Sequence, residues 1–206
     1  MERSIYLTQH EIDAIFNLDL SSLPQLDLAR DIFLVGCYTA RRFSDYSRIK
    51  SSNITTLENG VTAITLVQQK TKGEVIIPIR PELNKVLEKY GYNLPLTHEQ
   101  KVNKHIKEVG EKAKINEIIE VESIKGGFRV KEKKTKFKLI VTHTARRSAC
   151  TNMYNTGIAP LDIMQISGHK TEKEFLKYIK FKKKKTAMKL AKKKFFIGNN
   201  LKVSRQ

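Results

Sequence analysis

The sequence has no long apolar run, and this absence limits where the protein can work. A helix that crosses a bilayer needs about 20 consecutive apolar residues. No stretch of the 206 residues approaches that length, and no signal peptide precedes the first predicted helix. We therefore expect a cytoplasmic protein that does not enter a membrane.

Cysteine is also scarce, since the chain contains only Cys37 and Cys150. Both lie in apolar helical patterns, and neither has Cys or His neighbours at the spacing of a zinc site. An unpaired cysteine behaves as a small apolar residue, so we expect two free, buried thiols. The sequence indicates no metal and no other cofactor.

Acidic residues are too few to balance the basic ones. Lys and Arg number 39 and Asp and Glu number 21, which gives a net charge of +18 spread along the chain. Such a charge is untypical of an enzyme that acts on small molecules and indicates a polyanionic partner, with nucleic acid as the leading candidate. RNA-binding aromatics and a membrane-binding apolar face are not recognisable, which disfavours those two roles.

The apolar pattern predicts one α+β domain that is mainly helical, with a small three-stranded antiparallel sheet and a second β-hairpin. A capping box at Thr8 and Glu11 begins the first helix. The helix after Pro24 is apolar on more than one face, so we expect it to be central. The predicted strands are 53–56, 61–68 and 74–79, the hairpin is 121–139, and the further helices are 81–90, 99–114, 143–154, 161–166, 172–181 and 186–196.

Three short stretches, far apart in the chain, carry polar residues in a distinctive order. The first is Thr39–Asp45, with the sequence TARRFSD. The second is His143–Arg146, in which the His and Arg lie at i and i+3 on one helix face. The third is Ser167–His169, followed nine positions later by Tyr178. With a lysine in the predicted sheet, these stretches resemble the active-site boxes of the tyrosine recombinase (phage integrase) family, over residues 6 to about 196.

The resemblance implies an enzyme that cuts and rejoins DNA through a covalent 3′-phosphotyrosyl bond, without metal or ATP. Tyr178 is the implied nucleophile. Arg42 and Arg146 are the implied phosphate-neutralising residues, a role that suits guanidinium because it stays charged and presents a planar fork of donors. His143 and His169 are expected to move protons and hold the phosphate, as the corresponding family positions do.

The leaving 5′ oxygen needs a proton, which a lysine of the β-hairpin supplies in the family. Lys70 is our assignment, and Lys72 in the same turn is the alternative. Arg41 and Arg147 adjoin the two implied catalytic arginines, and a surface or DNA-backbone role is plausible for either member of each pair, although the register of the boxes favours Arg42 and Arg146. Ala40 stands where the family usually has glycine, a replacement that is least disruptive if φ stays negative.

The resemblance also implies the organisation and partners of the chain. Residues 1–185 correspond to the catalytic domain, and residues 186–206 to a basic helix and tail that either folds back on its own domain or, as often in related recombinases, docks into a neighbouring subunit. Double-stranded DNA and a homotetramer assembled on it are the implied partners, with weak or no association in its absence. Family members usually carry an N-terminal DNA-clamping domain, and the pattern here begins almost at Met1, so we expect a fragment or a reduced member.

Two other functions compete with the recombinase. A relaxing topoisomerase uses similar Arg, Lys, His and Tyr chemistry, and the active-site residues do not separate the two. A DNA-binding module without chemistry would have lost catalytic residues, and none is lost in this sequence.

Overall fold

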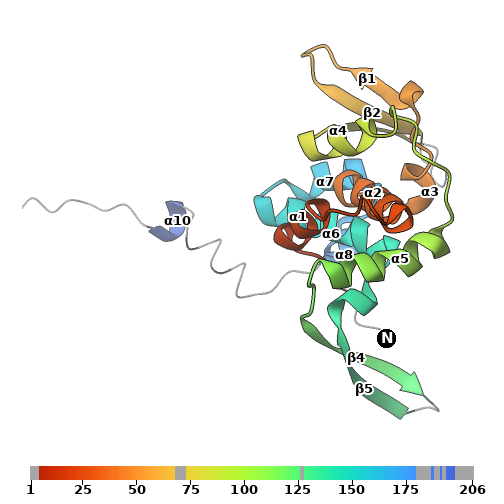
Figure 1. Ribbon diagram of the computed structural model, residues 1–206. Helices are drawn as coiled ribbons and strands as arrows, with labels where there is room; N and C mark the ends of the chain where they lie inside the picture. Colours follow the sequence, from red (N-terminus) through yellow and green to blue (C-terminus); the bar gives the residue numbers. More distant parts are fainter. Residues whose placement is uncertain are drawn as a thin grey trace, which may run out of the picture.

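The computed structural model describes residues 5–67, 73–125, 128–179, 187, 191 and 194–197. Within these ranges the chain forms a helical body with a small sheet at one end and a long β-hairpin at the other (Figure 1). This arrangement confirms the predicted α+β fold. None of the helices in the described part has the length and apolar character that a membrane crossing requires.

Helix α2 (Pro24–Thr39) lies at the centre of the body, as its sequence predicts. Residues on several sides of it are buried, and it packs against α1 (Gln9–Phe16), α5 (Glu99–Lys112) and α6 (Thr142–Thr156). Close packing leaves no room at Gly36, where an added Cβ would lie 2.8 Å from the Tyr46 ring. The core therefore surrounds α2 rather than lying against one face of it.

The three-stranded sheet has the predicted antiparallel order β1-β2-β3. Its strands are β1 (Ile54–Thr56), β2 (Thr62–Val67) and β3 (Glu74–Pro78), and alternate side chains of β2 and β3 point into the core. In Figure 1, α4 (Pro81–Glu88) lies between this sheet and the helical body. The inward-facing residues of the two longer strands are Ile64, Leu66, Val75 and Ile77.

The second hairpin consists of β4 (Ile118–Lys125) and β5 (Phe128–Thr135) and projects from the body (Figure 1). It begins before the predicted residue 121 and gives way to a 3₁₀ turn, η2 (Lys136–Leu139), where a strand was predicted. Lys136 explains the difference, because its Nζ lies 2.7 Å from a Glu11 carboxylate oxygen and only 5% of the residue is exposed. The ion pair holds the chain against the body.

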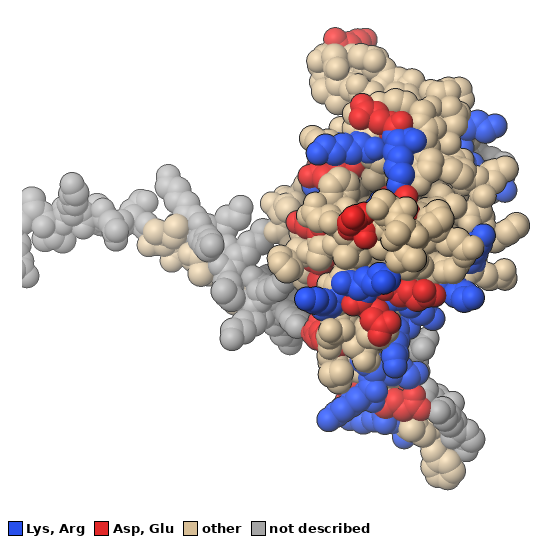
Figure 2. Space-filling model, viewed as in Figure 1, with Lys and Arg blue, Asp and Glu red and all other residues tan. Residues whose placement is uncertain are grey.

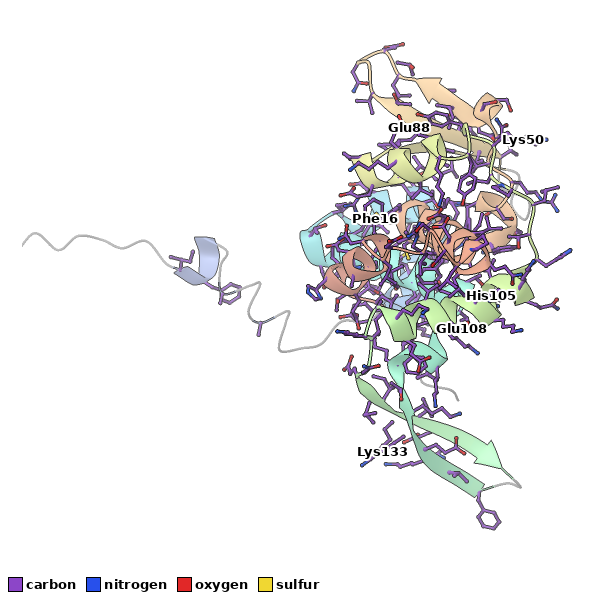
Figure 3. All side chains as sticks on the ribbon, in the orientation of Figure 1. Phe16, Lys50, Glu88, His105, Glu108 and Lys133 are labelled. Carbon is purple, nitrogen blue, oxygen red and sulfur yellow. The ribbon has the colours of Figure 1, made fainter. Side chains whose placement is uncertain are left out.

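The hairpin carries charges of both signs on its surface. Figure 2 shows Lys and Arg side chains along it and along the neighbouring body, interleaved with Asp and Glu. Lys133 lies on the half of β5 nearer the body, opposite Glu120 of β4, and its side chain is exposed, whereas the helical body is densely filled with side chains (Figure 3). The hairpin is thus an extension of the domain that reaches the core at its body end, where Val121 is buried and Ile119 packs against core residues.

The last described helices differ from prediction mainly in their ends. Helices α7 (Pro160–Ser167) and α8 (Glu172–Tyr178) are present, but α8 ends at Tyr178 instead of residue 181. Most of the predicted basic helix at 186–196 lies outside the described residues. The described part of this region includes the short helix α10 (Lys194–Ile197). Two short elements were not predicted, the helix α3 (Phe43–Tyr46) and the 3₁₀ turn η1 (Ser51–Asn53).

Candidate active site

Three separate segments bring together four of the predicted site residues, His143, Arg146, His169 and Tyr178. Helix α6 carries His143 in its first turn and Arg146 one turn later. Gly168 ends α7 in the left-handed conformation at φ 75°, which glycine adopts without steric cost, and the chain then turns to place His169 beside α6. Tyr178 is the last residue of α8 and contacts the same group.

The ring of Tyr178 is enclosed by imidazole and guanidinium groups. Its centroid lies 4.7 Å from that of His169 and 5.3 Å from that of His143, whose ring is perpendicular to it. The Cζ atoms of Arg146 and Arg147 lie 5.7 Å and 4.7 Å from the ring centroid. These distances are within the range of cation–π attraction, so the aromatic ring sits in a strongly positive surrounding.

The contacts of His169 define which ring nitrogen carries the proton. Its Nε2 lies 3.4 Å from Nη2 of Arg146, and its Nδ1 lies 2.7 Å from Oγ of Ser167. Guanidinium has only donors, so Nε2 must accept and Nδ1 must carry the hydrogen that it donates to Ser167. Ser167 therefore fixes the orientation of a neutral imidazole, a role that we did not assign from the sequence, although the residue directly precedes the Gly168-His169 box.

The two arginines that follow α2, Arg41 and Arg42, differ in their burial. Arg41 is fully buried, and it donates from Nη1 to the carbonyl of Ile166 at 2.8 Å and from Nη2 to Asp45 at 2.7 Å. Arg42 is only partly buried, and its charge contributes to lowering the pKa of His169. Arg41 thus has two structural partners, while the charge of Arg42 acts on both His143 and His169.

Ala40 corrects one expectation from the sequence. Its φ is +56°, in the left-handed region, and not negative as a harmless replacement of glycine would require. A side chain in this region costs about 1–2 kcal/mol. The residue is fully buried and belongs to the small apolar cluster that includes Cys150 and Phe175. Packing of its methyl group offsets part of the strain and keeps the turn that presents Arg42.

Three buried polar atoms of the site have no hydrogen-bond partner within the described residues. They are Nη1 of Arg42, Nη1 of Arg146 and the hydroxyl of Tyr178. Leaving such a group unpaired inside a protein costs about 1–3 kcal/mol, and more when it is charged. All three can donate, so the arrangement suits a ligand that offers several acceptor oxygens and negative charge.

Burial and positive charge shift the titration of the aromatic groups. Burial raises the pKa of Tyr178 to about 12, and the charges of Arg146 and Arg147 oppose that rise. Burial, with Arg146 and Arg42, lowers the pKa of His169 to about 4. Burial and the same kind of charge also lower the pKa of His143. Both imidazoles are therefore neutral at pH 7, while the arginines remain charged.

The remaining predicted residue, Lys70, and its alternative, Lys72, fall in the segment 68–72 between β2 and β3, outside the described residues. Cys37 and Cys150 are free and buried, as predicted. Within the described part, no group of three or more His, Cys, Asp or Glu side chains is arranged to hold a metal ion. The site is thus built of arginine, histidine and tyrosine.

The fold is similar to those of several solved recombinases. It matches XerA recombinase with a TM-score of 0.64 and 17% identity, over 91% of this chain and 64% of XerA. It matches XerH recombinase bound to palindromic difH substrate with a TM-score of 0.63 and 15% identity, over 90% of this chain and 52% of XerH. The chain therefore spans less than two-thirds of either Xer protein.

A closer match in length is the catalytic domain of bacteriophage HP1 integrase, with a TM-score of 0.53 and 19% identity, over 85% of this chain and 87% of that domain. No curated protein matches the sequence at a significant level. The family model described as the phage integrase family, however, matches residues 6–185. Because this match covers most of the chain, the protein belongs to the phage integrase family.

Proposed function

We propose that this protein is a site-specific tyrosine recombinase, which cleaves and rejoins double-stranded DNA through a covalent 3′-phosphotyrosyl bond to Tyr178. The observation that carries the proposal is the set of unpartnered donors on Arg42, Arg146 and Tyr178 within one cluster. A phosphodiester supplies the acceptor oxygens and negative charge that such a cluster lacks. Residues 1–185 form the catalytic part in this proposal.

The two arginines are proposed to stabilise the transition state. As the oxygen of Tyr178 attacks phosphorus, charge grows on the two non-bridging oxygens. Arg42 and Arg146 approach from different segments, the start of α3 and the middle of α6, so each can bind one of these oxygens. A guanidinium group keeps its charge in a buried site, whereas a buried lysine loses its charge more readily.

The tyrosine is proposed to exchange one phosphodiester bond for another. The bond from its phenolic oxygen to phosphorus forms, and the bond from phosphorus to the 5′ oxygen breaks. The phenolic proton passes to a neutral imidazole. We assign this role to His143, whose ring is perpendicular to that of Tyr178. His169, held by Ser167 and Arg146, positions the phosphate-binding arginine. Energy stays in the phosphotyrosyl bond, so rejoining requires neither ATP nor a metal.

DNA as the partner is supported by the charge of +18 and by solved relatives. XerH was solved bound to its difH substrate, and a lambda integrase dimer, 18% identical with a TM-score of 0.55, was solved bound to a core site. By analogy we propose that this protein assembles as a homotetramer on paired DNA sites, with residues 186–206 contacting a neighbouring subunit.

The experiment that tests the function is incubation with a nicked suicide DNA duplex, followed by a denaturing gel. The protein should form a covalent protein–DNA adduct, because the short fragment beyond the nick diffuses away and prevents rejoining. Tyr178→Phe should form none, although it folds and binds DNA as the parent protein does. An adduct from Tyr178→Phe would show that another residue is the nucleophile, and no adduct from the parent on cognate DNA would contradict the function.

Lys70 is proposed as the acid that protonates the leaving 5′ oxygen. Lys70→Ala should slow cleavage of an ordinary phosphodiester by about 10²–10⁴-fold, the usual contribution of general acid catalysis. A substrate with a 5′ thiol leaving group should restore most of the rate, since sulfur departs with little proton assistance. Lys72→Ala is the matched variant, and a larger defect there that the thiol rescues would move the assignment to Lys72.

A further inference from the structure

Arg147 directly follows the proposed phosphate-binding Arg146, yet it contacts the protein itself. Its guanidinium Cζ lies 4.7 Å from the centroid of the Tyr178 ring, closer than the 5.7 Å of Arg146. Its Nε also donates to the backbone carbonyl of Tyr178 at 3.3 Å. One side chain of α6 therefore binds both the ring and the main chain of one residue of α8.

The backbone contact lies where α8 needs it. The last carbonyls of a helix have no donor within the helix, and positive charge is favourable at that end. Tyr178 is the last residue of α8, a helix of seven residues whose one buried side chain is Phe175. At the end that carries the tyrosine, His143, His169 and Arg146 contact the ring, whereas Arg147 contacts the ring and also donates to the backbone carbonyl.

The two neighbouring arginines also differ in what their donors face. Nη1 of Arg146 is buried without a partner in the described residues, whereas no atom of Arg147 is in that state. Both guanidinium charges lower the pKa of Tyr178 and both come from α6. The geometry thus gives Arg146 an open donor for a ligand and leaves Arg147 engaged with Tyr178.

We propose that Arg147 is a positioning residue that fixes Tyr178 in line for attack, by stacking on its ring and binding its carbonyl. The inference rests on the proposed function, because it takes Tyr178 as the nucleophile. A tyrosine held from its own chain by Arg147 attacks the phosphate bound by the same chain's Arg42 and Arg146. Arg147 itself does not bind the phosphate.

The first test compares cleavage with DNA affinity. Arg147→Ala should lower the rate of adduct formation on the nicked suicide duplex by about 10–100-fold, because a displacement of about 1 Å in a reacting group can cost about 100-fold. Its Kd for the same duplex should stay within about two-fold of the parent value with an unchanged salt dependence, since no phosphate contact is lost. Arg129→Ala, on the exposed hairpin, controls for the loss of one positive charge.

The second test bypasses the tyrosine. In a duplex with a 3′-p-nitrophenyl phosphate end, the 5′ hydroxyl of the adjoining strand attacks phosphorus, its proton passes to solvent, and p-nitrophenolate leaves with the bonding electrons. This ligation needs the phosphate-binding groups but no nucleophilic tyrosine. Arg147→Ala and Tyr178→Phe should therefore ligate at nearly the parent rate, whereas Arg146→Ala should lose about 10²–10³-fold.

The conservative variant separates positioning from folding. Arg147→Lys can approach the ring or the carbonyl but lacks the planar fork that reaches both, so it should recover part of the adduct rate. Urea unfolding of each variant shows whether it is folded. Normal adduct formation by Arg147→Ala, or an equal loss of cleavage and ligation in the folded variant, would overturn the proposal. An adduct from Tyr178→Phe would instead overturn the function on which it rests.

Discussion

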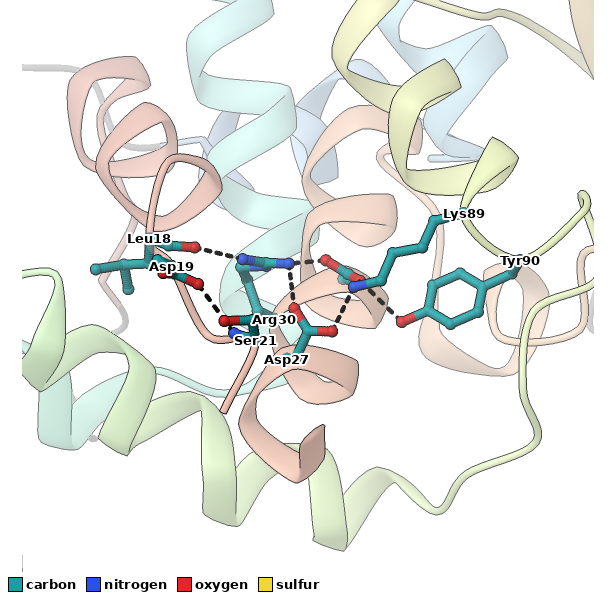
Figure 4. A network of polar contacts seen from close by, with 8 residues as sticks. Leu18, Asp19, Ser21, Asp27, Arg30, Lys89 and Tyr90 are labelled. Atoms are coloured by element: carbon teal, nitrogen blue, oxygen red, sulfur yellow. Dashed lines mark hydrogen bonds and ion pairs between the residues drawn. The ribbon is translucent and has the colours of Figure 1, made fainter. Parts of the chain in front are cut away.

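Two clusters of charged, partly buried side chains in this protein use similar residue types in opposite ways. The first joins α2 to the end of α4 (Figure 4). Asp31 accepts hydrogen bonds there from Arg30 at 2.9 Å, from Lys89 at 2.6 Å and from Tyr90 at 2.8 Å. Asp27 pairs with the same Arg30 and Lys89. Each charge in this cluster therefore has an opposite charge beside it.

The second cluster, around Tyr178, is positive without such compensation. Within the described residues, Arg42, Arg146 and Arg147 form no ion pair with a carboxylate. Arg146 and Arg147 instead contact a neutral imidazole, an aromatic ring and a backbone carbonyl. Concentrated positive charge destabilises the folded protein unless an anion compensates it. The presence of such a cluster therefore indicates a binding site for a negatively charged ligand and not a contribution to stability.

The difference shows how paired and unpaired buried charges can be told apart in function. A paired cluster fixes two elements relative to each other and contributes to the fold. An unpaired cluster lowers stability and is useful only where an anion binds. Substitutions that remove single side chains from each cluster test this division.

The neighbouring Arg41 and Arg42 should separate stability from catalysis. Arg42→Ala should lower cleavage by about 100–1000-fold, because it removes one preorganised donor for the transition state. Arg41→Ala should instead lower the free energy of unfolding by about 3–5 kcal/mol, because it removes the buried guanidinium that pairs with the carboxylate of Asp45 and donates to the carbonyl of Ile166. Single-turnover cleavage and urea unfolding measure the two effects.

The control for this pair is cleavage at a temperature where both variants are folded. There, Arg41→Ala should cleave faster than Arg42→Ala. A larger cleavage defect in Arg41→Ala under these conditions would show that the sequence box was read one residue out of register.

This register illustrates what the sequence could predict about the site. The boxes placed Arg42, His143, Arg146, His169 and Tyr178 in order along the chain, and the structure brings the five side chains together. The register of the boxes favoured Arg42 and Arg146, but the sequence could not show what each arginine of a pair contacts. That depends on the direction of each side chain after α2 and along α6, which tertiary packing determines.

The fold shows the same limit. Periodicity located the main helices, the three-stranded order and the projecting hairpin. It failed at Lys136, because a lysine in a basic strand pattern is usually exposed, whereas this one is buried by Glu11, which is 125 residues away along the chain. It also failed at Ala40, because alanine gives no local signal of a positive φ. Both errors arise from contacts between distant segments.

The paired cluster should affect stability alone. Asp31→Ala should lower the free energy of unfolding by about 1–3 kcal/mol, because it leaves donors of Arg30 and Tyr90 without their acceptor. Asp27 remains to hold Arg30 and Lys89, which keeps the loss below that expected for Arg41→Ala. Cleavage per folded molecule should match the parent rate. Lys133→Ala, an exposed charge on the hairpin, is the control and should change neither quantity.

The smallest expected effect is a pH dependence of stability that comes from His169. Burial and the nearby Arg146 lower its pKa in the folded protein to about 4, against an ordinary value of 6.5. Between these two values the unfolded chain binds a proton at this position and the folded protein does not. The free energy of unfolding contributed by this group is therefore fully present above pH 6.5, falls as the pH drops toward about 4, and changes no further below that.

Urea midpoints at pH 7 and pH 5 should show the fall in the parent protein. His169→Gln cannot titrate and should show a smaller fall, with a remainder from His143, whose pKa is lowered for the same reasons. An equal fall in both proteins would mean that His169 is not held neutral by the positive cluster, and the contrast between the two charge clusters would lose its electrostatic basis.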